Sequence, residues 1–221
     1  MKNNTIIFDL DGTLIDSSEG IVAAFNHALK KFGLPQQPPE KITPMIGFPV
    51  ETMFGQFTTN SLNELKSAFR TKAMETVVNA SRPLPGAEAA IISLFEDGYK
   101  LGIATTKIRS HIDGILEKLG WVDFFEAVIG GDEVSNVKPH PEQFEQLLKK
   151  MNSQIESSVV VGDTVNDVLA AKATGVRVVA VCSPYGGEAE LRASQPDYVI
   201  DKISQLPFLL NNGNPQRKEP L

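Results

Sequence analysis

Short runs of apolar residues recur along the chain, and segments with helical periodicity separate them. The runs have the length of β-strands and lie at 5–10, 100–105, 126–129, 158–162, 176–182 and 197–200. Within one of them, Val159, Val160 and Val161 follow one another without a polar residue. Continuous apolar runs of this kind are typical of parallel strands that are buried on both faces.

The segments between these runs carry apolar residues at helical spacing. The stripes comprise Ala87, Ala90, Ile91, Leu94 and Phe95; Ile112, Ile115, Leu116 and Leu119; and Phe144, Leu147, Leu148 and Met151. Gly98 and Gly120 follow the first two stripes, Gly175 follows a shorter one at 168–173, and Pro141 suits the first position of the third. Strands that alternate with such helices predict an α/β fold with a doubly wound, Rossmann-like parallel sheet that binds ligands at its strand ends.

The alternation stops between residues 16 and 82, where no strand pattern is found. Two helical stripes occupy this part, one with Ile21, Phe25, Leu29 and Phe32 and one with Leu62, Leu65, Phe69, Ala73 and Val77. A proline-rich stretch at 35–49 separates them, and residues 82–86 suit a hinge. We therefore predict an α/β core domain of residues 1–15 and 82–210, an inserted α-helical cap domain of residues 16–81 and a polar tail of residues 211–221, which we expect to be poorly anchored.

Composition excludes several classes of protein. The 221 residues are 42% hydrophobic and carry a net charge of −6. They lack the basic character that a nucleic-acid-binding protein needs. The chain has a single cysteine, Cys182, and its first apolar run is too short for a signal peptide. No apolar run approaches membrane-spanning length. We expect a cytoplasmic protein with no nucleic-acid or membrane partner, and the sequence leaves its oligomeric state open.

The first candidate for chemistry is Asp9-Leu10-Asp11-Gly12-Thr13, which follows the first strand. Residues two apart in an extended chain face the same way, so both carboxylates should project from the strand end. Two such charges need a cation between them, or one of them must hold a proton. Gly12 allows a tight turn after them. An ordinary turn rich in Asp and Gly is the alternative interpretation.

A second acidic segment, Gly162-Asp163-Thr164-Val165-Asn166-Asp167, follows another strand. Asp163 stands at the strand end, and Asp167 falls on the same side of the incoming helical turn. Either acid could instead cap the helix or face solvent. Carboxylates gathered at strand ends suit Mg²⁺, which prefers hard oxygen ligands, water and phosphate.

Hydroxyl and ammonium groups that could hold phosphate oxygens stand at two further points. Thr105, Thr106 and Lys107 close one strand, and Lys138 precedes a helix. Each is an ordinary residue when taken alone. The three histidines, His27, His111 and His140, have no neighbours at metal-binding spacing and are interpreted as structural or solvated.

Taken together, these segments resemble the four motifs of the haloacid dehalogenase superfamily. They are Asp9-Leu10-Asp11-Gly12-Thr13-Leu14, Thr105, Lys138-Pro139 and Gly162-Asp163-Thr164-Val165-Asn166-Asp167, in that order. The helical insertion resembles the α-helical cap of that superfamily, and the resemblance covers residues 5–210. Within it the chain looks most like the phosphoglycolate phosphatase group. Asp16-Ser17, Ile46-Gly47-Phe48 and Ala104-Thr105-Thr106-Lys107 are similar to that group, although Thr106 stands where many members have Asn.

The resemblance implies a Mg²⁺-dependent phosphatase that hydrolyses a small phosphorylated metabolite, similar to phosphoglycolate, through an aspartyl-phosphate. Asp9 would be the nucleophile, and Asp11 the general acid and base. The phosphate would be held by Gly12, Thr105, Thr106 and Lys138. The metal would be held by Asp9, Asp11 through its backbone carbonyl, Asp163 and Asp167, the last from behind the direct ligands or through water. Gly47 and Val50 of the cap would determine substrate specificity.

Other functions share the same core motifs. A phosphomutase similar to β-phosphoglucomutase would differ only in the cap, where mutases carry a basic residue at the position of Val50. Arg70 or Lys72 could replace that residue. Pyrophosphate competes with phosphoglycolate as the substrate. A dehalogenase would use Asp9 without a metal and would not need both Asp11 and Asp163. A binding protein on this fold would not need the complete set of motif residues.

Overall fold

The computed structural model describes residues 4–59, 61–185 and 187–212. Its core is a sheet of six parallel strands, in the order β5-β4-β1-β6-β7-β8. The strands are β1 (Thr5–Phe8), β4 (Lys100–Ala104), β5 (Ala127–Ile129), β6 (Ser158–Gly162), β7 (Arg177–Val181) and β8 (Tyr198–Ile200). The predicted α/β class is confirmed. Because β1 lies between β4 and β6, the chain segments after these three strands meet at the centre of one sheet edge.

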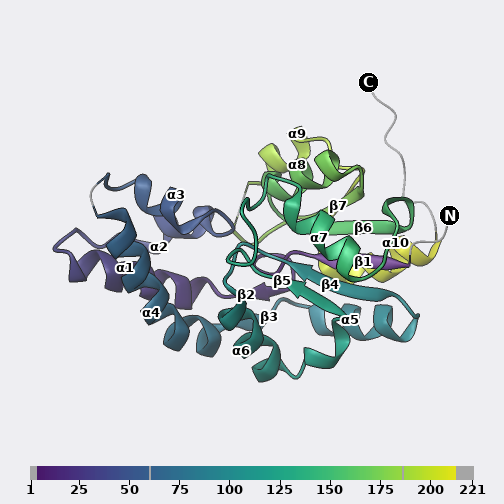
Figure 1. Cartoon of the computed structure of the whole chain (residues 1–221), viewed down its shortest axis with the longest axis horizontal. Coiled ribbons are helices and arrows are strands. Elements are labelled where there is room, and N and C mark those ends of the chain that lie inside the picture. The colour runs from purple at the N-terminus through teal and green to yellow at the C-terminus, as the bar shows by residue number, and fades with distance from the viewer. Residues whose placement is uncertain (1–3, 60, 186, 213–221) are drawn as a thin grey trace.

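Helices cover both faces of this sheet (Figure 1). They are α5 (Ala87–Glu96), α6 (Arg109–Leu119), α7 (Glu142–Lys150), α8 (Val165–Thr174), α9 (Glu188–Ala193) and α10 (Leu206–Asn212). The faces alternate along β1: Ile6 and Phe8 join the cluster that contains α5 and α6, whereas Ile7 joins the cluster that contains α7 and α8. Burial on both sides accounts for the uninterrupted apolar runs of the strands.

The sequence signals for helix ends correspond to real ends. α6 and α8 stop at Gly120 and Gly175, both of which adopt the left-handed conformation that ends a helix. Pro141, predicted as the first helical residue of α7, precedes the helix as its cap residue. Its backbone is already helical, so the difference is one residue.

The inserted part of the chain is helical. It contains α1 (Ser18–Lys31), α2 (Pro39–Ile42), α3 (Val50–Gly55) and α4 (Leu62–Ala80), which stand together beside the α/β core (Figure 1). Phe25 of α1 stacks on Phe54 of α3 with 4.2 Å between ring centroids. The proline-rich stretch holds α2 and a 3₁₀ turn at Thr43–Met45, neither of which the hydrophobic pattern predicts. The boundaries of the cap domain stay a prediction.

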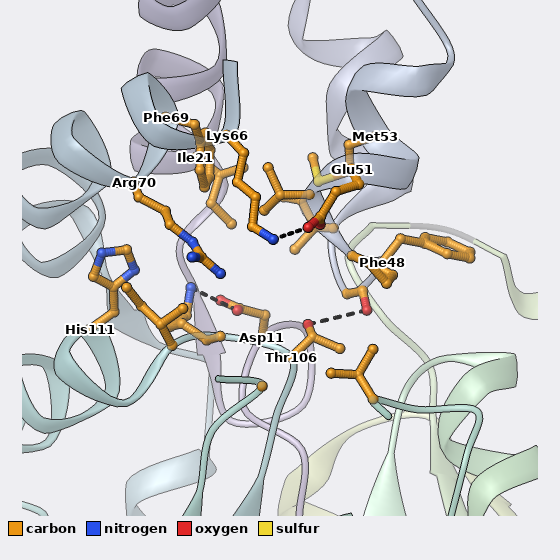
Figure 2. Close-up of a pocket in the computed structure, with 18 of the residues that line it drawn as sticks. Asp11, Ile21, Phe48, Glu51, Met53, Lys66, Phe69, Arg70, Thr106 and His111 are labelled. Atoms are coloured by element: carbon orange, nitrogen blue, oxygen red, sulfur yellow. Dashed lines mark hydrogen bonds and ion pairs between the residues drawn. The ribbon is translucent and has the colours of Figure 1, made fainter. Parts of the chain in front are cut away.

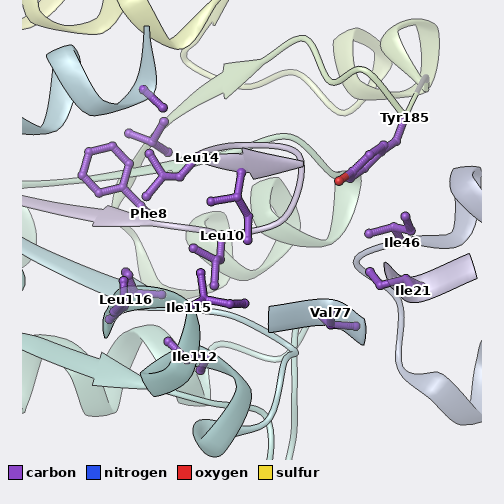
Figure 3. Packing of buried hydrophobic residues seen from close by; sticks show 14 of the residues in the cluster. Phe8, Leu10, Leu14, Ile21, Ile46, Val77, Ile112, Ile115, Leu116 and Tyr185 are labelled. Carbon is purple, nitrogen blue, oxygen red and sulfur yellow. The ribbon is translucent and has the colours of Figure 1, made fainter. Parts of the chain in front are cut away.

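A pair of very short strands joins the helical part to the core. β2 (Ile15–Asp16) and β3 (Arg82–Pro83) run antiparallel, with Ile15 opposite Pro83 and Asp16 opposite Arg82. The hydrophobic pattern predicts no strand between residues 16 and 82, and this is wrong at both ends, because two-residue strands are too short to show an alternating pattern. The buried cluster continues across the junction, from Leu10 and Leu14 in the core to Ile21 and Val77 in the cap (Figure 3).

Helix α10 reaches into the predicted polar tail of residues 211–221, whose bounds stay a prediction. α10 continues to Asn212, and Asn211 is anchored: its side-chain amide donates to Asp97 at 2.8 Å and its carbonyl accepts from the Tyr99 hydroxyl at 3.2 Å. Residues 213–221 lie outside the described part of the chain. In the described part, no helix combines the length and apolar character needed to cross a membrane.

Candidate active site

A buried lysine connects two carboxylates at the sheet edge. Lys138 Nζ lies 2.6 Å from Asp9 Oδ1 and 2.6 Å from Asp167 Oδ1, and it also donates to the Ala104 carbonyl at 3.0 Å. All three charged side chains are at least 95% buried. Burial opposes the charged form of Lys138, but attraction to Asp167 and Asp9 outweighs it and raises the pKa of Lys138. The lysine is therefore a fixed positive charge beside Asp9.

A third carboxylate completes an acidic cluster. Asp163 follows β6 and accepts a hydrogen bond from Thr13 at 2.8 Å. Single oxygen atoms of Asp9, Asp163 and Asp167 all lie within 4.8 Å of one another. Burial, opposed by Lys138, raises the pKa of Asp9 to about 7. Burial together with the charges of Asp9 and Asp167 raises the pKa of Asp163 well above its usual range.

This cluster has the chemistry of a divalent-metal site. With all three carboxylates ionised, they and the one ammonium carry two net negative charges in a buried volume, which a divalent cation would neutralise. The raised pKa values of Asp9 and Asp163 reflect the cost of this charge when no cation is bound. The donor atoms are hard oxygens, which suit Mg²⁺ or Ca²⁺ better than a softer metal. Asp11 is predicted to contribute to the metal site through its backbone carbonyl; its side chain is not part of this cluster, and the predicted carbonyl ligand stays a prediction.

Asp167 also forms the start of α8. Thr164 is the N-cap residue; its hydroxyl accepts from the Asp167 amide at 3.2 Å, and its own amide donates to Asp167 Oδ2 at 3.0 Å. With Oδ1 on Lys138 and Oδ2 on Thr164, both oxygens of Asp167 have protein partners. This arrangement favours a role behind the direct metal ligands, and that role of Asp167 stays a prediction.

Asp11 points away from the acidic cluster and into a cavity. Its Oδ2 pairs with Lys107 Nζ at 2.8 Å, and its Oδ1 accepts a hydrogen bond from the Ser17 hydroxyl. The Ser17 amide in turn donates to the Tyr185 hydroxyl at 3.1 Å, and that hydroxyl donates to Asp16 at 3.1 Å. The carboxylate of Asp11 is thus oriented by the segment that leads into the cap.

Two features require glycine at position 12: its backbone conformation and the close approach of the Asp163 side chain. Gly12 has a φ of +80°, and a Cβ atom there would lie 2.1 Å from Asp163 Oδ2. The predicted role of Gly12 in binding phosphate is a separate matter and stays a prediction. Any other residue at this position would displace Asp163 from the acidic cluster.

The two predicted phosphate-binding threonines differ in their surroundings. Thr105 is buried, and its hydroxyl accepts from the Lys107 amide at 3.3 Å. Its carbonyl accepts from Gln143 at 2.8 Å, and Gln143 also accepts from the Lys138 amide at 3.4 Å. Thr106 is half-buried, and its hydroxyl donates to the carbonyl of Gly47 in the cap at 3.3 Å. Its side chain thus contacts the cap, and its predicted role in binding phosphate stays a prediction.

A cavity of about 350 Å³ lies between the cap and the core and includes Asp11, Thr106 and Lys107 (Figure 2). Both predicted specificity residues, Gly47 and Val50, line it. Its cap wall carries Lys66, Arg70 and Glu51, with Lys66 paired to Glu51. His111 lines its side. Lys72, considered as a replacement for a mutase cation, pairs with Glu75 and does not line this cavity, whereas Arg70 does.

The sequence does not predict the roles that four residues have at this site. Ser17 orients Asp11, Tyr185 holds Ser17, Gln143 joins the Lys138 segment to Thr105, and His111 lines the cavity. Ser17 has a signal, since it follows a recognisable motif. The other three lie on elements whose relative positions depend on the packed fold.

Comparison with known proteins gives consistent results. The family model described as haloacid dehalogenase-like hydrolase matches residues 6–181. The chain is 34% identical to pyrophosphatase PpaX of Bacillus mycoides (strain KBAB4), over 97% of this chain and 100% of that protein.

Solved structures agree in fold. A predicted phosphoglycolate phosphatase from Haemophilus somnus 129pt superposes with a TM-score of 0.85 at 28% identity, over 95% of this chain and 98% of that chain. A haloacid dehalogenase-like family hydrolase from Streptococcus pneumoniae gives a TM-score of 0.84 at 29% identity, over 92% of this chain and 96% of that chain. The resemblance found in the motifs is therefore confirmed.

Proposed function

Because the chain belongs to the haloacid dehalogenase-like hydrolases, we propose that it hydrolyses a small phosphoric anhydride or ester through an aspartyl-phosphate, with inorganic pyrophosphate as the favoured substrate. The observation that carries the proposed chemistry is the buried contact of Asp9 with Lys138 beside Asp163. A carboxylate is a weak nucleophile that phosphoryl oxygens repel, and a fixed cation reduces that repulsion.

In this mechanism Asp9 attacks phosphorus through the oxygen that Lys138 does not hold. Lys138, which precedes α7, and Thr105, which follows β4, bind the phosphoryl oxygens. Asp11, held by Ser17 and Lys107, protonates the leaving oxygen and then accepts a proton from the hydrolytic water. The cap keeps bulk water out of the cavity during the first step.

The acidic cluster would hold the metal through Asp9 and Asp163, with the Asp11 carbonyl as a further ligand and Asp167 behind them. Mg²⁺ bound there would neutralise charge on the phosphoryl oxygens and on Asp9. Since burial raises the pKa of Asp9 to about 7 in the metal-free protein, a cation would also keep this nucleophile ionised.

Two substrates have support. Pyrophosphate is favoured by the similarity to a pyrophosphatase over nearly the whole chain. Phosphoglycolate, which the motifs favour, has support from the similarity to the structure of a predicted phosphoglycolate phosphatase. Both are small, and the cavity of about 350 Å³ is at the lower end of the range for small-molecule sites.

A substrate panel tests this proposal. Initial rates of phosphate release should be measured with pyrophosphate, phosphoglycolate, sugar phosphates and nucleotides in Mg²⁺ buffer, and we expect pyrophosphate to have the highest kcat/KM. A higher kcat/KM for phosphoglycolate would instead support the phosphoglycolate phosphatase activity that the motifs favour. With β-glucose 1-phosphate and catalytic glucose 1,6-bisphosphate, formation of glucose 6-phosphate faster than phosphate release would instead identify a mutase.

Removal of divalent metal should abolish turnover. We expect EDTA to stop phosphate release completely, and excess Mg²⁺ to restore it, because the buried carboxylates would otherwise face an anionic substrate without a cation to neutralise them. Ca²⁺ should not support turnover, since it takes more ligands at longer distances. Full activity in metal-free buffer would contradict the metal role and favour a dehalogenase-like chemistry. Inhibition by beryllium fluoride or aluminium fluoride in the presence of Mg²⁺ would report the phosphoryl site directly, because these anions mimic a phosphoryl group on a carboxylate.

A further inference from the structure

The charged side chains that line the cavity do not balance. Asp11 is paired with Lys107, and Glu51 is paired with Lys66. Of the described residues that line the cavity, this leaves Arg70 as a positive charge without a carboxylate partner. Figure 2 shows the Arg70 side chain extending from α4 into the cavity toward Asp11, and the Lys66 side chain extending from α4 toward Glu51. The cavity thus carries a surplus positive charge on its cap side.

This positive charge acts on its neighbours. Burial, and then repulsion by Arg70, lowers the pKa of Lys66. Two cations repel one another inside a cavity, and an anion that binds between them replaces this repulsion with attraction. An arginine guanidinium is also a planar fork of donors that fits the oxygens of a phosphate or a carboxylate.

An imidazole nitrogen without a partner lies beside them. His111 is 97% buried and lines the same cavity, and its Nε2 has no hydrogen-bond partner among the described residues. Burial, and then the charge of Lys107, lowers the pKa of His111 to about 4, so its ring is neutral near pH 7. A hydrogen bond to the Arg70 backbone opposes this lowering, so the ring already has one polar partner. A neutral imidazole has one N–H donor and one acceptor nitrogen, and a buried Nε2 without a partner is unfavourable in either form. An anion in the cavity would favour the form of the ring that donates from Nε2.

We propose that Arg70, His111 and Lys66 form a subsite for a second anionic group of the substrate, on the cap side of the cavity and apart from the acidic cluster. The inference rests on the proposed function, because it assigns the reacting phosphoryl group to Asp9. It narrows the substrate to a compound with two anionic groups, such as pyrophosphate or a phosphorylated small acid. Esters with a neutral leaving group should use only half of the site.

The test uses non-hydrolysable ligands, so that it does not depend on turnover. Methylenediphosphonate has two anionic groups, whereas methylphosphonate has one and is otherwise its counterpart. Their binding to the Mg²⁺-loaded protein should be measured by calorimetry. We expect wild type to bind methylenediphosphonate at least about 30-fold more tightly, as charge-assisted hydrogen bonds would predict. Phosphonoacetate, measured in parallel, distinguishes a carboxylate from a phosphonate as the second group.

Variants locate the effect. Arg70→Met should remove about 30-fold of the methylenediphosphonate affinity and leave methylphosphonate within about twofold. Arg70→Lys should retain part of it, since it keeps the charge but loses the fork. His111→Phe should cost about fivefold for the same ligand. Lys72→Met, two residues along α4 and outside the cavity, is the matched control and should change neither ligand.

The outcomes separate this subsite from the proposed function. Equal binding of both ligands to wild type, or an equal loss of both in Arg70→Met, would overturn the subsite. A preference for methylenediphosphonate that Arg70→Met removes supports the subsite, even if wild type hydrolyses no substrate of the panel. In that case the proposed hydrolysis would fail while the subsite stood.

Discussion

Replacement of Asp9 by asparagine should lower kcat by at least about 10⁴-fold, because it removes the proposed nucleophile. The asparagine keeps the shape of the side chain and an oxygen that can accept from Lys138. Substrate binding should therefore persist. The measurement is single-turnover phosphate release with purified wild type and variant at saturating Mg²⁺. Retention of a tenth of the wild-type rate would show that Asp9 is not the nucleophile.

Stability measurements serve as the control and carry a pH dependence of their own. Burial raises the pKa of Asp9 from 3.8 to about 7 in the metal-free protein. The folded state thus holds a proton that the unfolded state releases, and stability contributed below pH 4 is lost as the pH rises toward 7. In EDTA, the stability of wild type should fall over this window relative to Asp9→Asn. A constant difference between the two proteins would contradict the raised pKa.

Substitution of Lys138 by methionine should produce the largest loss of stability of any single change at the site. The ammonium lies 2.6 Å from both Asp9 and Asp167, and all three groups are buried. Removing one partner of a buried ion pair leaves uncompensated charge and costs about 3–5 kcal/mol. Urea unfolding in EDTA measures this loss, and turnover should vanish as well.

A double variant separates charge from packing. In Lys138→Met/Asp167→Asn, one of the two carboxylates that lose their partner is neutralised, so part of the lost stability should return. The exposed Lys72–Glu75 pair provides the control: Lys72→Met should change stability by no more than about 0.5 kcal/mol. If the double variant is as unstable as the sum of its single changes, Lys138 contributes through packing rather than through its charge.

The sheet could be predicted because buried parallel strands leave a strong local signal. The six apolar runs correspond to the six strands, and glycine marks the ends of α6 and α8. The β2–β3 pair could not be predicted, since two residues show no periodicity. Asn211 also escaped prediction, because its contacts with Asp97 and Tyr99 join residues more than a hundred positions apart.

The site, too, contains residues that the sequence could predict and residues that it could not. Asp9, Asp163 and Lys138 could be placed together because their motifs end neighbouring strands or precede a helix at the same sheet edge. Asp167 could be found as well, although its capping contact with Thr164 could not. The sequence alone favours a structural role for His111, because only the folded chain brings α6 against α4 and forms the cavity that this side chain lines.

The capping box of α8 makes the protein its own spectroscopic probe. The Thr164 amide proton is bound to the same carboxylate that holds Lys138, so its magnetic environment depends on the charge at the centre of the site. Its NMR signal in ¹⁵N-labelled protein should shift when a cation or phosphate analogue arrives. The signal of this one amide can thus report whether the site is occupied, without a chromogenic substrate or a coupled assay.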